Sequence, residues 1–177
     1  AALVAEQSAV VPLLIDLLRS PDFSDPLFPG YGFGPALAVR CLGLIGDKRA
    51  LISLFEAIGE GDFFNEDLIL DAIKAIGEPA KAFLLKVLHG KPLNKDNERA
   101  AIALERFKED QFVCNICLDM LHDPEVRKDI PLTAYLNLVC EGLASQEGRD
   151  RFKALAANPD IPSSLKRDFQ STIELWK

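Results

Sequence analysis

One stretch decides the fold: Cys41-Leu42-Gly43-Leu44-Ile45-Gly46-Asp47, which recurs along the chain. It returns as Ala72-Ile73-Lys74-Ala75-Ile76-Gly77-Glu78 and, in weaker form, as Ala103-Leu104-Glu105-Arg106-Phe107-Lys108-Glu109. The copies are 31 residues apart. In each copy a small residue is followed by an aliphatic residue and by an apolar residue three positions later, which is helical spacing. A repeat of this length predicts an array of helical hairpins.

Each copy ends in a signal for a turn. Gly46 and Gly77 suit helix C-termini, where a residue in the left-handed conformation ends the helix. An acidic residue follows each turn and can cap the next helix, and Pro79 suits the first turn of a helix. A second amphipathic segment then begins. These segments cover residues 50–58, 80–88 and 112–121.

The C-terminal part of the chain predicts two further, less regular hairpins. Their helices are expected over residues 132–143 and 149–157, with a last helix capped by Ser163 or Ser164 and running to Trp176. Strict apolar–polar alternation is absent and β-branched residues are sparse, which argues against a sheet. We therefore predict an all-α fold, a right-handed α-α superhelix of about five hairpins that bury their faces by stacking.

This chain is expected to form one domain over residues 1–177. Residues 36–121 hold the clearest repeats, residues 20–35 form a long loop, and residues 122–177 form degenerate repeats and a cap.

The repeats resemble the HEAT repeat in its short, bilin-lyase-like form. The resemblance rests on Leu42–Asp47, with Ala50 and Leu54-Phe55 behind it, and on Ile73–Ala80. Two features depart from the family pattern. The arginine expected early in each inner helix is found only near its place, at Arg99, and the third turn has Lys108 in place of glycine. The resemblance implies a solenoid whose inner helices line a concave surface, and such solenoids serve many binding roles.

Composition narrows the possible partners. The 177 residues carry a formal net charge of −7, and no basic patch stands apart from acidic neighbours, so we expect no nucleic-acid partner. The apolar run at residues 9–18 is too short to span a membrane and contains Asp16, and no signal-peptide pattern precedes it. Four cysteines in such a chain predict a cytoplasmic protein with free thiols. The chain begins with Ala1, so we expect a trimmed form or a fragment.

The cysteines and histidines predict no metal, no cofactor and no catalytic residue. Cys114 and Cys117 form a single C-x-x-C inside a predicted helix, whereas a structural zinc site usually needs four ligands. We expect both, and Cys41, to be small core residues. His89 and His122 each end an outer helix, where the helix dipole favours a cation. Iron-binding His-Glu pairs, as in the HEAT-type deoxyhypusine hydroxylases, do not occur in the sequence.

The loop at residues 20–35 has two readings. It contains four prolines, three glycines and four aromatic residues, and it is longer than most connections between helices. Its aromatic side chains either fold back to cap the end of the solenoid or form an exposed interaction element. In the second reading Phe28, Tyr31 and Phe33 contact a partner.

The inner helices supply a second candidate surface. Under the 31-residue offset, Arg40 and Asp71 share one position, and Lys74 and Glu105 share another. Asp67, Asp71 and Lys74 lie on one helix face at i, i+4 and i+7. This mixed-charge surface either meets a partner or is a solvated face with ion pairs within each helix.

These features predict a non-enzymatic scaffold that binds a protein or peptide through its concave face, the loop at residues 20–35, or both. Neither the partner nor the oligomeric state follows from the sequence. The alternative is a bilin-type chromophore lyase or small-molecule binding protein, implied only by the resemblance, in which Asp67, Asp71 and Glu105 would supply acid–base groups. A HEAT-like reader of DNA lesions would need a basic concave face, against which the net charge of −7 argues.

Overall fold

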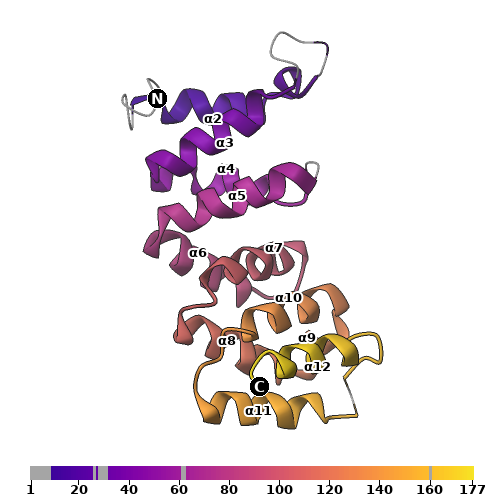
Figure 1. Cartoon of the computed structure of the whole chain (residues 1–177). Coiled ribbons are helices and arrows are strands. Elements are labelled where there is room, and N and C mark those ends of the chain that lie inside the picture. The colour runs from indigo at the N-terminus through magenta and orange to yellow at the C-terminus, as the bar shows by residue number, and fades with distance from the viewer. Residues whose placement is uncertain (1–8, 26, 28–31, 61–62, 160) are drawn as a thin grey trace. The chain divides into compact units, whose positions relative to one another are not determined.

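Every regular element that the structure describes is a helix. This structure is a computed structural model, and it describes residues 9–25, 27, 32–60, 63–159 and 161–177. The α-helices are α2 (Val11–Arg19), α3 (Gly34–Ile45), α4 (Leu51–Glu56), α5 (Phe63–Ile76), α6 (Glu78–Leu88), α7 (Lys95–Leu104), α8 (Gln111–Leu121), α9 (Pro124–Lys128), α10 (Ile130–Cys140), α11 (Gln146–Ala156) and α12 (Lys166–Glu174). Short 3-10 helices are η2 (Pro21–Ser24), η3 (Lys48–Ala50) and η4 (Glu105–Phe107). The predicted all-α fold is confirmed (Figure 1).

These helices divide into two compact units, Ala1–Phe83 and Leu84–Lys177, and α6 continues from the first into the second. In the first unit α3 packs against both α2 and α5. Leu42, Leu54 and Ile73, one from each of α3, α4 and α5, are fully buried. Phe55 and Phe83 meet edge to face, with ring centroids 5.2 Å apart. The predicted second helices of the first two hairpins are therefore present as α4 and α6.

The turns of the first two repeats have the predicted geometry. Gly46 and Gly77 have φ angles of 67° and 75°, in the left-handed region. After the first turn, the Asp47 carboxylate accepts a hydrogen bond from the Arg49 backbone N–H and caps η3. The hydrogen bonds from the side chain and backbone of Arg49 lower the pKa of Asp47.

The third turn differs, at the position where the sequence departs from glycine. α7 runs into the 3-10 helix η4, and Lys108 follows it with a φ of −67°. A lysine is strained at positive φ, so a left-handed turn like those at Gly46 and Gly77 is disfavoured here. The next helix, α8, is capped by Asp110, which accepts a hydrogen bond from the Phe112 N–H.

In the second unit, buried polar side chains join the helices. The amide nitrogen of Asn97, on α7, donates to the carbonyls of Val87, Leu88 and Gly90 at the end of α6. Its oxygen accepts from the backbone N–H of Asn94, so one buried side chain caps both helices. Arg127 has the same kind of role, because its guanidinium donates to the carbonyls of Leu121 and His122 at the end of α8.

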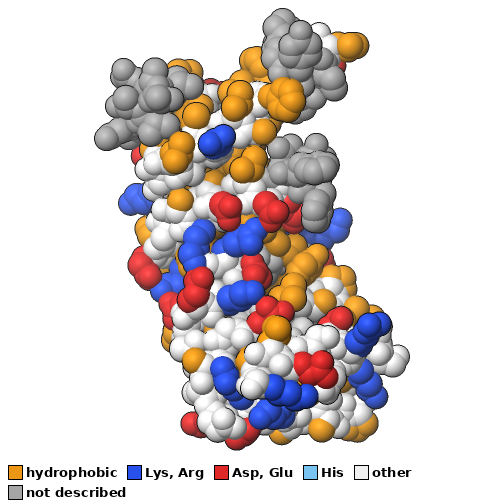
Figure 2. Space-filling model, in the orientation of Figure 1, with side chains coloured by type: hydrophobic (Ala, Val, Ile, Leu, Met, Phe, Trp, Pro, Cys, Tyr) orange, Lys and Arg blue, Asp and Glu red, His pale blue; other side chains and the backbone are white. Residues whose placement is uncertain are grey.

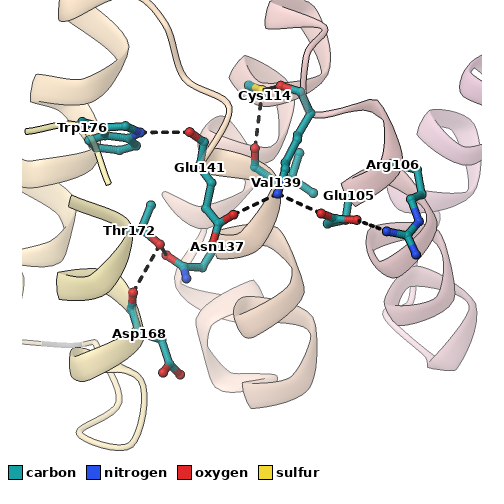
Figure 3. Close-up of polar contacts among 10 residues, drawn as sticks. Glu105, Arg106, Cys114, Asn137, Val139, Glu141, Asp168, Thr172 and Trp176 are labelled. Atoms are coloured by element: carbon teal, nitrogen blue, oxygen red, sulfur yellow. Dashed lines mark hydrogen bonds and ion pairs between the residues drawn. The ribbon is translucent and has the colours of Figure 1, made fainter. Parts of the chain in front are cut away.

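The C-terminal helices pack through aromatic contacts. Phe152 of α11 stacks on Phe169 of α12 with ring centroids 5.1 Å apart, and it meets Trp176 edge to face at 5.2 Å. The Trp176 indole N–H donates to the Glu141 carbonyl over 2.9 Å (Figure 3). The predicted last helix is present, but its predicted cap is wrong: α12 begins after Leu165, without a side-chain cap from Ser163 or Ser164.

Candidate interaction surface

One face of α3 exposes large apolar side chains. Phe33, at the N-cap of α3, is 65% exposed, Leu37 is 59% exposed and Leu44 is 67% exposed. Their spacing of four and seven residues places them along one side of the helix, and we call them the α3 stripe. Cys41, expected in the core, is only half-buried. In Figure 2, hydrophobic side chains gather over α2 and α3, and charged side chains of both signs lie next to them.

A shallow groove of about 230 Å³ runs between α3 and α5. Both helices contribute mainly apolar or small side chains to it, and one charged residue each. Its lining residues are Val39, Arg40, Gly43, Leu44, Leu68, Asp71, Ala72 and Ala75. Gly43 lets the helices approach closely, because a Cβ placed there would lie 3.0 Å from the Cα and Cβ of Ala72. The α3–α5 groove and the α3 stripe share Leu44, so they form one continuous surface.

The structure brings two of the predicted binding residues together here. Arg40 and Asp71 both line the α3–α5 groove, and both are exposed. Among the described residues Arg40 has no hydrogen bond or ion pair. Asp67 is exposed on α5, one turn before Asp71, whereas Lys74 is half-buried rather than fully exposed as expected.

Glu105, by contrast, belongs to the second unit and takes part in an ion-pair network. Its carboxylate contacts the Lys108 amino group at 2.8 Å and the Arg106 guanidinium at 3.4 Å. Lys108 also pairs with Glu141 at 2.9 Å, so two carboxylates point toward one ammonium group (Figure 3). Partial burial lowers the pKa of Lys108, but the hydrogen bonds to Glu105 and Glu141 outweigh this effect and raise it. These contacts give Glu105 a structural role.

The loop at residues 20–35 is described only in part. Phe28 and Tyr31 lie outside the described residues. The described part includes η2, which the sequence did not suggest, and Leu27, which is 93% exposed. Phe33 is therefore the one predicted aromatic residue of the three whose exposure the structure gives.

The three cysteines of the second unit are buried, which confirms the expectation for Cys114 and Cys117. Cys114, Cys117 and Cys140 are each 0% exposed. The Cys114 thiol donates to the Lys108 carbonyl over 3.0 Å. Burial raises the pKa of Cys114 to about 11 and raises the pKa of Cys140 well above its ordinary value. A raised pKa leaves little thiolate at neutral pH, so these thiols are poor nucleophiles.

Both histidines lie at helix ends, where the sequence placed them. His89 follows α6 and donates from Nδ1 to the Leu85 carbonyl over 2.7 Å. His122 caps α8 and donates from Nδ1 to the Leu118 carbonyl over 2.8 Å. Among the residues that the structure describes, no three His, Cys, Asp or Glu side chains form a group that could hold a metal ion. Nor does any helix in this described part combine the length and apolar content needed to cross a membrane.

Sequence reasoning points to Phe33 but misses the exposure of Leu37 and Leu44. Leu44 belongs to the repeat motif, and no motif distinguishes Leu37. The composition of this helix could have indicated exposed apolar side chains, since Arg40 is the only charged residue between Gly34 and Ile45. A helix that is apolar on every side is buried or binds a partner.

Comparison with known proteins adds no family. No protein-family model matches the chain, and no curated protein is significantly similar to it.

Proposed function

We propose that this chain is a HEAT-like α-solenoid that acts as a scaffold and binds a protein partner through the surface formed by the α3 stripe and the α3–α5 groove. The observation that carries the proposal is the exposure of Phe33, Leu37 and Leu44 along one helix, beside an apolar groove. Contiguous exposed apolar surface rimmed by polar residues is typical of a protein-interaction site.

The packing of equivalent helices supports the solenoid part of the proposal. Helices α3 and α5 hold the first two copies of the repeat and pack directly against each other in the first unit. In the second unit α7, which leads into the third copy, packs directly against α10. Stacking of successive repeats in this way is the basis of solenoid stability.

Polar substitution of the α3 stripe tests the function. The full chain is used as bait with cell extract, alongside a double variant Leu37→Gln, Leu44→Gln and a control variant Ile52→Gln. Ile52 is 57% exposed on α4 and does not line the groove. It therefore matches Leu37 and Leu44 in size and exposure but lies outside the proposed surface. We expect the wild type and the control to capture the same specific protein and the double variant to bind it about tenfold or more weakly, because apolar anchors dominate interfaces.

The three proteins should have equal melting temperatures, because all three positions are exposed. Equal capture by the double variant would contradict the proposed binding surface. A visible absorbance change on adding a linear tetrapyrrole, lost in the double variant, would favour the bilin-lyase alternative instead.

A further inference from the structure

The first unit holds nearly all of the net negative charge of the chain. Residues 1–83 contain 12 Asp and Glu but 6 Lys and Arg, a net charge of −6, whereas the whole chain carries −7. Three of these six basic side chains are also held in ion pairs within the unit. The pairs are Arg19–Glu56, Arg49–Asp47 and Lys81–Glu78. The potential around the first unit is therefore negative, and it attracts basic segments.

On the α5 side of the candidate surface two carboxylates are exposed, whereas Lys74 on the same helix face is half-buried. Asp71 lines the groove and is exposed, and Asp67 is exposed one helical turn away. Arg40 is the exposed basic residue of the groove lining. A segment lying on α3 would thus place its apolar side chains on the α3 stripe and its polar flank over the two α5 carboxylates.

The length of the stripe suits a helical segment. Phe33 and Leu44 are 11 residues apart on α3, which corresponds to about 16 Å, or about three helical turns. Apolar anchors at i, i+3 or i+4, and i+7 of a bound helix span about 10 Å, so all three fit within the length of the stripe.

Resting on the proposed function, we propose that the partner presents a basic amphipathic helix, with its apolar side on the α3 stripe and its lysine or arginine side chains over Asp67 and Asp71. In this arrangement Arg40 opposes binding, since it is a cation facing a cationic segment. Its substitution by an acid therefore strengthens the complex. If Arg40 instead anchored the partner through hydrogen bonds, the same substitution would weaken the complex.

The test is a selection followed by charge-reversal variants. A phage library of 16-residue helical peptides has leucine fixed at i, i+4 and i+7, with Lys, Glu, Gln and Ser allowed at the other positions. It is selected on the full chain after depletion on the Leu37→Gln, Leu44→Gln variant. We expect the selected peptides to be rich in lysine and to bind more weakly as salt increases. For a selected peptide, Asp71→Lys should weaken binding roughly tenfold and Arg40→Glu should strengthen it roughly threefold.

Three results would overturn the inference: selection of glutamate-rich peptides, weaker binding in Arg40→Glu, or no peptide that depends on Leu37 and Leu44. The proposed function fails separately, when the double variant captures the cellular partner as well as the wild type does. If capture depends on the stripe but the selected peptides are acidic, the proposed function stands and only the basic partner is wrong. Because Arg40 has no partner within the described residues, Arg40→Glu should leave the fold intact.

Discussion

Single residues decide how the repeats are joined. Gly77 takes a left-handed φ of 75° between α5 and α6, and a Cβ placed there would meet no atom within 4 Å. The requirement for glycine at this turn is therefore conformational rather than steric. At Gly142 it is steric, because a Cβ would lie 1.8 Å from the Lys108 carbonyl oxygen. The two glycines are needed for different physical reasons.

We expect Gly77→Val to lower the free energy of unfolding by about 1–3 kcal/mol, because a β-branched residue is strained at positive φ. Gly77→Asn should cost less than about 1 kcal/mol, since asparagine tolerates the left-handed region. Urea denaturation followed by circular dichroism measures both. Equal midpoints for the valine and asparagine variants would contradict the conformational explanation.

At the scale of elements, α12 is held by a small number of side chains. Phe169 is 1% exposed and stacks on Phe152, Thr172 contacts Asn137 at 3.2 Å, and Trp176 binds the Glu141 carbonyl. Asn137 lies in the last turn of α10 and Glu141 directly follows it, so α12 covers the end of that helix. α12 has many charged and polar residues, and its docking depends on this one apolar side.

Phe169→Ala should destabilise the second unit by roughly 3–5 kcal/mol, because it removes a fully buried aromatic ring and leaves a cavity. Leu175→Ala is the matched control near the same end of the chain, and it should change stability by less than about 0.5 kcal/mol, since Leu175 is 66% exposed. Trp176 is the only tryptophan of the chain, so its fluorescence during guanidinium unfolding reports on this packing. Similar midpoints for the two variants would show that α12 is not docked through Phe169.

Across the whole molecule, the chemistry of the four thiols is divided between the units. The first unit contains the half-buried Cys41, and the second contains the buried Cys114, Cys117 and Cys140. The side chain of Cys41 lies on the same helix as the α3 stripe. In the native chain we therefore expect a thiol reagent to reach only Cys41, in the first unit.

A chromogenic thiol reagent at pH 8 should react quickly with one thiol of the native protein and with four after denaturation, and Cys41→Ser should remove the quick reaction. Burial raises the folded-state pKa of Cys114 to about 11, above its ordinary value of 9.0. The unfolded chain therefore loses this proton first as the pH rises. The contribution of Cys114 to the free energy of unfolding should be constant below about pH 9 and decrease between pH 9 and 11. A quick reaction of two or more thiols at pH 8 would contradict the burial of the second-unit cysteines.

Local sequence determined the helices and their turns. The 31-residue repeat predicted α4, α6 and α8 within a few residues, because amphipathic periodicity and turn residues act over a few neighbouring positions. The left-handed conformation at Gly46 and Gly77 was predicted for the same reason. The burial of Cys114 and Cys117 was also predictable, since both fall inside an apolar helical segment.

Tertiary structure alone decided which side chains are exposed and which polar groups pair. Leu37 and Leu44 look like core residues in the sequence, yet they are exposed because the helices packed on α3 cover its other sides. Glu105 resembles a surface residue in the sequence. In the structure it pairs with Lys108, which also pairs with Glu141, 36 positions after Glu105. Burial and pairing are properties of neighbours distant in the chain, so a reading of one segment at a time cannot supply them.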